Sequence, residues 1–496
     1  MRDPAAVYLD YAATTPVDAA VAAVMAECLG PEGTFGNPAS LHAFGSAAAR
    51  RVDEARAQVA ALINAAPDEI IFTSGATEAN NLAILGCARA NADRGRHVLT
   101  MRTEHKAVLD PCRHLERSGG SVTYLTPAPN GVLAPEALAH ALRPDTVLVS
   151  VMAANNETGV LQDLAALGAV CRARGVAFHS DCAQAAGRVA LDVRQLPLDL
   201  LSFTAHKIYG PKGVGALFVR RGARGLLQPV SFGGGQERGL RPGTLPVHQI
   251  AGFGAACEIL VRARGREAER LAALEDRLWT GLRTLGDVFL NGEDAPRAPG
   301  LLNVSFAGVE GESLVSGLQG VAVSTGAACN SEAREPSYVL RAMGRDARLA
   351  ESSLRFSLGR FSTEGDVDAA IAAVRAQVQH LRALSPQRAA PPWEAAAGGE
   401  VPVSGEAGGL TEGTWVRFHL LTAGDTVKDA RFQAFACPHT VHTAERLCRE
   451  LRGRRRADLI PGTPAQWARE HLIPVEKLGR LLVVEDALRA CLTHWA

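Results

Sequence analysis

The stretch from Glu69 to Arg220 constrains the fold most, because short apolar runs recur there with room for a helix between most of them. The runs cover residues 69–73, 97–101, 147–153, 176–180, 198–204 and 214–219, and most are separated by alanine-rich segments of helical spacing. Alternation of this kind predicts an α/β fold with a mainly parallel sheet wrapped by helices. Ligands of such sheets bind beyond the carboxyl ends of the strands, so the residues that follow each run are the first site candidates.

The remaining sequence predicts further units, as expected for a chain of 496 residues, which is too long for one hydrophobic core. We assign residues 17–259 to the large domain. Residues 1–16 and 260–384 form a smaller α+β lobe, with strand-like runs at 301–306 and 353–358. Residues 385–413 are rich in Pro, Gly and Ala and predict a flexible linker, and residues 414–496 form a third unit.

The charge and cysteine content of the chain limit the kinds of molecule that it is expected to bind and the compartment in which it is expected to work. Lys plus Arg and Asp plus Glu both number 52, so no net field gathers nucleic acid or an anionic membrane. No apolar run approaches the length of a membrane span, and the amino terminus shows no export signal. The ten cysteines include no CxxC pair, which argues against a disulfide framework or zinc ribbon. We expect a cytoplasmic protein that acts on a small molecule.

Lys207 stands where a strand ends, in the segment SFTAHKIYGPKG. An amine at the apolar mouth of a sheet loses hydration, which lowers its pKa and frees its lone pair to form a Schiff base. Taken alone, the segment fits a solvated turn lysine better.

Three other strand ends change that interpretation. Asp181 follows one run and can keep a pyridine nitrogen protonated. Thr77 lies in SGATEAN, where a helix begins and free N–H groups suit a phosphate. His105, in TEHKAV, can stack on a ring or carry protons. Each has an ordinary explanation as a helix cap or structural histidine, but the set with Lys207 meets the needs of pyridoxal phosphate.

Eight blocks of the sequence resemble housekeeping cysteine desulfurases, which belong to the fold-type I, class V aminotransferase-like superfamily. The resemblance runs from Val7 to about Ser385, and the blocks are YLDYAATTP, FTSGATEANNLAI, TEHKAVLD, NNETGV, SFTAHKIYGPKG, GTLPVHQI, EPSYVLRAMG and SLRFSLGR. It implies that Lys207 binds pyridoxal phosphate covalently, that Asp181 pairs with the pyridine nitrogen and that His105 stacks on the ring.

The same resemblance implies the rest of the cofactor site. Gln184 contacts the phenolic oxygen of the cofactor. The phosphate is held by Ala76, Thr77, Thr204 and His206, with Thr244 of the partner subunit, so a homodimer is expected.

Cys329 lies among small residues in a segment, 314–338, that has no helical or strand period. Small side chains permit a mobile loop, which a sulfur carrier requires. An arbitrary cysteine is more often buried and inert, and the family pattern favours a nucleophile here. Two positions depart from that pattern: Ala327 stands where a Ser is common, and Gln236 where a His is common.

The resemblance also implies a reaction. Arg355 and Asn156 hold the carboxylate of L-cysteine, Lys207 removes the α-proton, and the Cys329 thiolate attacks the substrate sulfur. The products are L-alanine and a persulfide on Cys329, with His105 as proton carrier. The alternatives are a selenocysteine lyase, a transaminase, or a sulfur-relay or scaffold protein with a catalytically silent amino-terminal part.

The third unit is similar to the U-type iron–sulfur scaffold protein at VKDARFQAFAC and IPVEKLGRLLVVEDALRACL. Cys437 alone matches a scaffold cysteine; the other two positions fall near Glu412 and at Gly479. A cluster needs about four donors, so an ordinary assembly site is not expected. Three interpretations remain open: Cys437 accepts sulfur, the segment from Cys437 to His442 binds a metal, or the unit is a degenerate docking domain. The sulfur acceptor is a scaffold, a tRNA-thiolation protein or this unit.

Overall fold

The large domain is built on a seven-stranded sheet. The computed structural model describes residues 6–325, 336–386 and 399–495. The strand order is β2-β8-β7-β6-β5-β3-β4, and β8 runs antiparallel to its two neighbours while the other pairs are parallel. The strands are β2 (Ile70–Thr73), β3 (His97–Met101), β4 (Ser121–Leu125), β5 (Thr146–Ser150), β6 (Ala177–Asp181), β7 (Leu200–Thr204) and β8 (Gly215–Val219). The predicted α/β fold with a mainly parallel sheet is confirmed.

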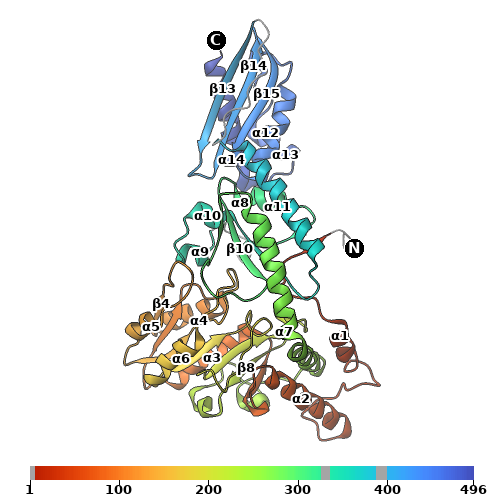
Figure 1. Cartoon of the computed structure of the whole chain (residues 1–496), viewed down its shortest axis with the longest axis vertical. Helices are drawn as coiled ribbons and strands as arrows, with labels where there is room; N and C mark the ends of the chain where they lie inside the picture. The colour runs from red at the N-terminus through yellow and green to blue at the C-terminus, as the bar shows by residue number, and fades with distance from the viewer. Residues whose placement is uncertain (1–5, 326–335, 387–398, 496) are drawn as a thin grey trace.

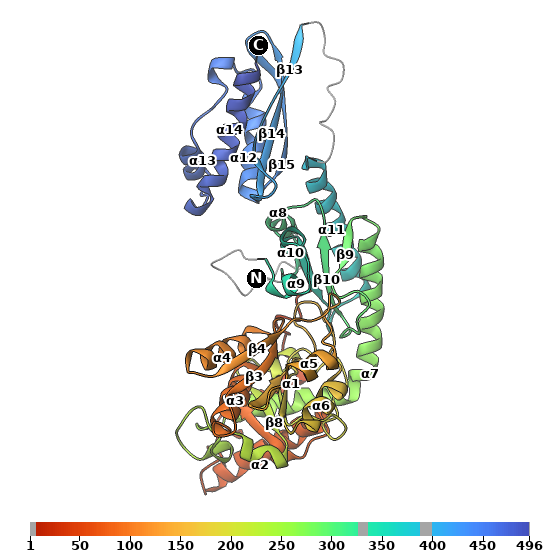
Figure 2. The same ribbon diagram turned by 90° about the vertical axis from the view of Figure 1, so that its left-hand side faces the viewer.

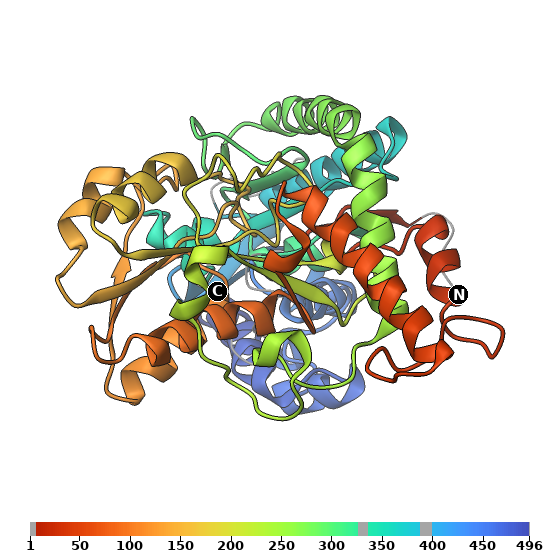
Figure 3. The same ribbon diagram turned by 90° about the horizontal axis from the view of Figure 1, so that it is seen from below.

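Helices cover both faces of this sheet, which accounts for its nearly continuous apolar strands (Figures 1 and 3). Successive side chains of a strand point to opposite faces, so Phe218 joins one core cluster and Leu217 the other. The covering helices are α1 (Ala19–Ala26), α2 (Ala43–Leu62), α3 (Ala76–Ala90), α4 (Lys106–Arg117), α5 (Pro135–Ala141) and α6 (Leu164–Ala173).

One long helix, α7 (Val247–Arg283), belongs to both the large domain and the smaller lobe. Its first half packs on α1 and α2, whereas Leu271, Leu274, Leu278 and Leu282 enter the core of the smaller lobe at helical spacing. The boundary expected between residues 259 and 260 therefore falls inside a continuous helix.

The smaller lobe contains an antiparallel sheet of order β12-β10-β9, and β1 pairs with β11 beside it. The strands are β1 (Val7–Tyr8), β9 (Val288–Leu290), β10 (Leu301–Phe306), β11 (Val321–Ala322) and β12 (Ser353–Ser357). The helices are α8 (Gly311–Ser316), α9 (Tyr338–Ala342), α10 (Ala347–Glu351) and α11 (Glu364–Leu384). The smaller lobe therefore combines residues that precede the large domain in the sequence with residues that follow it.

The C-terminal unit has a core of its own, in which Phe418, Trp467 and Leu488 are buried. Its antiparallel sheet, β13 (Glu400–Gly409), β14 (Thr414–Ala423) and β15 (Thr426–Phe435), carries α12 (Pro438–Leu451), α13 (Pro464–Glu470) and α14 (Leu478–His494) on one face (Figure 2). The unit lies beyond the smaller lobe, at the end of the molecule away from the large domain (Figure 1).

Strand β13 corrects the predicted linker, because it occupies residues 400–409 of the range 385–413. Composition misled the prediction at Gly405, where a Cβ would collide with the backbone of Cys491 in α14. This glycine lets a helix cross the strand closely, so it serves packing rather than flexibility. Within the described ranges, no helix combines the length and apolar character of a membrane span.

Candidate active site

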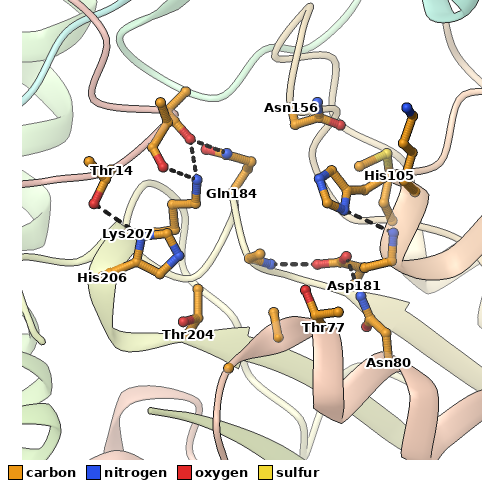
Figure 4. A pocket seen from close by; sticks show the side chains of 18 of the residues that line it. Thr14, Thr77, Asn80, His105, Asn156, Asp181, Gln184, Thr204, His206 and Lys207 are labelled. Atoms are coloured by element: carbon orange, nitrogen blue, oxygen red, sulfur yellow. Dashed lines mark hydrogen bonds between the residues drawn. The ribbon is translucent and has the colours of Figure 1, made fainter. Parts of the chain in front are cut away.

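A cavity of about 760 Å³ opens where the strands of the large sheet end and the smaller lobe begins. Ten of the predicted site residues line it: Ala76, Thr77, His105, Asn156, Asp181, Gln184, Thr204, His206, Lys207 and Arg355. Figure 4 shows side chains from several separate elements converging on this space. The ends of parallel strands meet at one edge of the sheet, which explains why residues so distant in sequence come together.

Lys207 ends a single 3-10 turn that follows β7. Its Nζ donates hydrogen bonds to the carbonyl oxygens of Ala12 and Ala13, at 2.7 Å for Ala13. Burial, aided by the nearby Arg355 guanidinium, lowers the pKa of Lys207 to about 8. About a tenth of the amine is therefore neutral at pH 7, far more than for an exposed lysine.

Asp181 is the last residue of β6, and its side chain is buried in the cavity wall. Its Oδ2 accepts a hydrogen bond from Asn80 Nδ2 at 2.7 Å, and its Oδ1 accepts one from the Ala183 N–H at 2.9 Å. Asn80 was missed by sequence reasoning. It follows Ala76 and Thr77 by one helical turn on α3, and that spacing on one helix face was the available signal.

The amino end of α3 forms an anion cradle beside Thr204 and His206. Gly75 precedes the helix with a φ of 153°, a conformation that favours glycine. His206 Nδ1 lies 3.2 Å from Thr14 Oγ1, and burial lowers the pKa of His206 to about 4. His206 is therefore neutral near pH 7 and can offer a hydrogen bond to a phosphate oxygen.

His105 caps α4, and its Nδ1 accepts the N–H of Ala107 at 3.1 Å. That hydrogen bond leaves the proton of the neutral ring on Nε2. Burial lowers the pKa of His105, so the ring is neutral near pH 7. In Figure 4 His105 and Lys207 lie on opposite sides of the cavity.

Arg355 reaches the cavity from β12 in the smaller lobe. Its Nη1 donates to the backbone oxygen of Asn156 at 3.0 Å, and its Nη2 donates to Asp10 Oδ1 at 2.7 Å. Within the described part of the chain, Arg355 Nε and Asn156 Oδ1 are buried without a hydrogen-bond partner. A substrate carboxylate can accept from the free guanidinium donor.

The residues present fit pyridoxal phosphate. The amine of Lys207, the carboxylate of Asp181 and the amino end of α3 match the aldehyde, ring nitrogen and phosphate of that group. In addition, Asn80 Oδ1 is buried beside Asp181 with no hydrogen-bond partner among the described residues. The cavity has the size of an ordinary cofactor pocket.

Comparison with known families agrees with this chemistry. The model of the family described as aminotransferase class-V matches residues 7–370. A cysteine desulfurase IscS of Pectobacterium atrosepticum is 55% identical over 381 residues, which cover 77% of this chain and 94% of that protein. The chain belongs to the cysteine desulfurases of the class V aminotransferase family. Its cofactor is pyridoxal phosphate, as in that family.

Other relatives support the same assignment. Escherichia coli cysteine desulfurase IscS is 54% identical over 381 residues, with the same coverage of both chains. A solved NifS-like protein superposes with a TM-score of 0.70 at 35% identity, covering 76% of this chain and all of that one. A structure titled SspA in complex with cysteine gives a TM-score of 0.64 at 34% identity, covering 72% of this chain and 99% of that one.

Two buried acids of this cysteine desulfurase were not predicted from the sequence. Burial raises the pKa of Glu157 to about 7, and its Oε2 accepts the Ser337 hydroxyl. Burial also raises the pKa of Glu104, whose backbone oxygen accepts the Tyr338 hydroxyl at 2.7 Å. Ser337 and Tyr338 lie at the amino end of α9, so these two contacts hold that end of the helix against the large domain. The position of Glu157 beside Asn156 was the available signal.

Among the described residues, Thr244, Gln236 and Cys437 do not line the cavity. Cys329 and Ala327 lie outside the described residues. Thr244 is exposed, and Gln236 Oε1 accepts the N–H of the adjacent Gly243 at 3.0 Å. Cys437 lies in the C-terminal unit, fully buried, with its Sγ 3.3 Å from Thr440 Oγ1.

Proposed function

We propose that the enzyme converts L-cysteine to L-alanine and collects the sulfur as a persulfide on Cys329. The observation that carries this is the pairing of Lys207, whose amine has a lowered pKa, with Arg355, which brings an unsatisfied guanidinium donor to the same cavity. One group suits proton removal from an amino acid, and the other suits its carboxylate. The cysteine desulfurase relatives support cysteine as the amino acid.

The chain's own residues have distinct tasks in this reaction. Lys207 holds the cofactor and later takes the proton from the substrate Cα, while Arg355 orients the substrate carboxylate. Bound pyridoxal phosphate withdraws electrons from Cα. His105 moves the proton of the substrate thiol through Nε2. The Cys329 thiolate attacks that sulfur, a sulfur–sulfur bond forms, and the carbon–sulfur bond breaks with its electron pair left on carbon for protonation to alanine.

A homodimer would complete the cofactor site with Thr244 of the partner subunit. Two observations support this proposal. Thr244 is exposed and does not line the cavity of its own chain. Large apolar side chains, Phe44 and Phe232, are 58% and 82% exposed. Exposure of such side chains is typical of surfaces that a partner covers.

The C-terminal unit resembles a U-type scaffold, and Cys437 stays the predicted internal sulfur acceptor. Its sulfur is buried, so loading it would require the unit to open locally. Scaffold and tRNA-thiolation proteins remain the predicted external acceptors. The described cysteines are all free and buried, which is consistent with work in a reducing cytoplasm.

A two-part measurement tests this function. The holoenzyme is incubated with L-cysteine and dithiothreitol, and alanine and sulfide are quantified. We expect equal amounts of both products, and Cys329→Ala should abolish them because the acceptor thiolate is lost. In a second incubation without dithiothreitol, mass spectrometry of the alkylated enzyme should show one added sulfur on the peptide that contains Cys329. Full alanine and sulfide formation by Cys329→Ala would show that the mechanism is wrong.

A further inference from the structure

Residues 236–243 form a loop that leads directly to Thr244, shortly before α7 begins. Glu237 and Arg238 in this loop both adopt the left-handed backbone conformation, with φ values of 46° and 59°, although neither is a glycine. Such conformations persist only where the surrounding structure fixes them, and they gather near ligand sites. Specific contacts must therefore hold the 236–243 loop in place.

A buried ion pair anchors the start of the loop to the large domain. The side chains of Glu237 and of Arg56 in α2 are 2% and 12% exposed. Glu237 Oε1 lies 2.6 Å from Arg56 Nη2, and Glu237 Oε2 accepts the Phe72 N–H of β2 at 2.7 Å. Arg56 also donates to the backbone oxygen of Ile70 at 2.9 Å. Breaking a buried pair leaves one charge uncompensated, so this end of the loop is firmly fixed.

A side-chain hydrogen bond closes the loop on itself. Gln236 Oε1 accepts the N–H of Gly243 at 3.0 Å, which joins the first residue of the loop to the last. Gly243 has a φ of 103°, a value that favours glycine. Because Thr244 follows Gly243 directly, this hydrogen bond sets the position of Thr244 relative to the anchored end.

A third contact joins the loop to the phosphate cradle of its own chain. Arg241 Nε donates to Glu78 Oε1 at 3.0 Å, and Glu78 Oε2 accepts the Ser74 N–H at the turn before α3. Glu78 lines the cofactor cavity, whereas Thr244 is exposed and does not line it. The loop is therefore fixed at three places, and the residue that follows it is accessible to a partner.

We propose that Gln236 and Glu237 are positioning residues that hold Thr244 where its hydroxyl donates to the cofactor phosphate of the partner subunit. The proposal rests on the homodimer proposed above. A hydrogen bond to an ionised phosphate is strong, but it requires the donor to be within about 3 Å of the acceptor oxygen. A loop that is fixed before binding loses little conformational freedom when the phosphate arrives. The contacts of the loop therefore raise the affinity for the phosphate.

Cofactor binding to the full-length enzyme, freed of its cofactor, tests the proposal because pyridoxal phosphate and pyridoxal differ only in the phosphate. Sedimentation velocity first establishes that each variant is a dimer. The Kd of each compound is then measured from the absorbance band of the lysine-bound form. We expect Thr244→Ala to raise the Kd of pyridoxal phosphate by about tenfold, the loss expected for one hydrogen bond to a charged group. The Kd of pyridoxal should not change.

Variants of the loop separate positioning from a general effect on stability. Gln236→Ala should raise the Kd of pyridoxal phosphate by about three- to tenfold, and Glu237→Gln, which removes the anchoring charge, should act in the same direction. Added to Thr244→Ala, Gln236→Ala should cause no further rise, since a positioning residue acts only through the residue that it positions. Gln195→Ala, which removes an exposed side-chain hydrogen bond to Asp192, is the matched control and should change neither Kd.

Mixed dimers, purified through two different affinity tags, show which subunit's site the loop acts on. Lys207→Ala in one chain restricts the lysine-bound absorbance band to the site of the other chain. When Gln236→Ala lies in the same chain as Lys207→Ala, the intact site receives the altered loop, and the Kd of pyridoxal phosphate should rise. When the two substitutions lie in different chains, the Kd should equal that of a mixed dimer without Gln236→Ala.

Three results would overturn the proposal while leaving the desulfurase function intact. The first is binding of pyridoxal phosphate that Thr244→Ala does not weaken. The second is a further rise in Kd when Gln236→Ala is added to Thr244→Ala. The third is a rise in Kd when Gln236→Ala and Lys207→Ala lie in different chains, because the loop would then act on its own chain's cradle through Arg241. A monomeric enzyme would contradict the proposed homodimer and this inference together, and failure to form alanine would contradict the proposed desulfurase function itself.

Discussion

The cofactor cavity and the surroundings of Cys437 differ in how completely their buried polar groups are hydrogen-bonded. The cavity keeps Asp181 and Arg355 buried and Lys207 half-buried, and it leaves Arg355 Nε without a protein partner in the described chain. Cys437 is also buried, but its sulfur contacts Thr440, and Cys437 does not line the cofactor cavity. A buried donor without a hydrogen-bond partner lowers the stability of the folded chain. Such a donor is tolerated where a bound ligand supplies the missing partner.

The comparison also separates two kinds of resemblance. In the region that is similar to cysteine desulfurases, ten predicted site residues from several strands and helices line one cavity. The predicted similarity of the C-terminal unit to a scaffold protein includes one matching cysteine, Cys437. In the described part of the molecule, no group of three or more His, Cys, Asp or Glu is arranged to hold a metal.

The largest expected effect separates the two regions directly. Lys207→Ala should lower the rate of alanine formation by at least about 10³-fold, because it removes the group that holds the cofactor and takes the α-proton. Cys437→Ala should leave that rate unchanged. Alanine is measured by mass spectrometry, and circular dichroism confirms that both variants fold. A comparable loss of alanine formation in both variants would show that the cofactor cavity and the surroundings of Cys437 do not differ in their role in this reaction.

Arg355→Lys tests the substrate end of the cavity. The lysine keeps a positive charge but loses the planar fork that contacts Asp10 and Asn156. We expect KM for L-cysteine to rise by about 10- to 100-fold, the loss of one or two charge-assisted hydrogen bonds. Steady-state kinetics provide the measurement, with Arg417→Lys on the C-terminal sheet as control. An unchanged KM would place the substrate carboxylate elsewhere.

The lowered pKa of Lys207 gives a pH prediction. Only the neutral amine attacks an aldehyde, so the cofactor-free enzyme should capture pyridoxal phosphate faster as pH rises. The rate should increase about tenfold per pH unit below pH 8 and level off above it, since the pKa is about 8. Stopped-flow absorbance follows the capture. A rise that continues to pH 10 would indicate an exposed, unperturbed amine.

Glu157 carries the smallest expected effect. Its folded-state pKa, raised to about 7, lies above the unfolded value, so its contribution to stability is present at low pH and is lost as pH rises through 7. Glu157→Gln cannot ionise. The melting temperature of this variant relative to the unsubstituted enzyme should therefore increase by a few degrees between pH 5 and pH 8. Differential scanning calorimetry at both pH values checks the sign, and a constant difference would contradict it.

The sequence predicted those parts of the site that follow a strand. Lys207, Asp181, Thr77 and His105 each come after an apolar run, and parallel topology places such residues together. Arg355 came from resemblance, because no local pattern indicates that the smaller lobe reaches the cavity.

The remaining features depend on tertiary packing. Asn80 and Glu157 look locally ordinary, and their roles arise from contacts with residues far away in sequence. Strand β13 was taken for linker because its glycines signal flexibility in a sequence, whereas Gly405 is required for the passage of α14. Strand β4 is half-buried at the sheet edge and lacked a strong apolar signal.

Helix α7 is about 55 Å long, at 1.5 Å per residue. It belongs both to the domain that holds Lys207 and to the lobe that holds Arg355. Gly254 and Gly281 lie where neighbouring residues leave no room for a Cβ, but Gly265, near the middle, has open space around it. A glycine in a helix interior weakens it by about 1 kcal/mol relative to alanine. Gly265 is therefore the position at which α7 has the least side-chain support, midway along the helix that joins the domain of Lys207 to the lobe of Arg355.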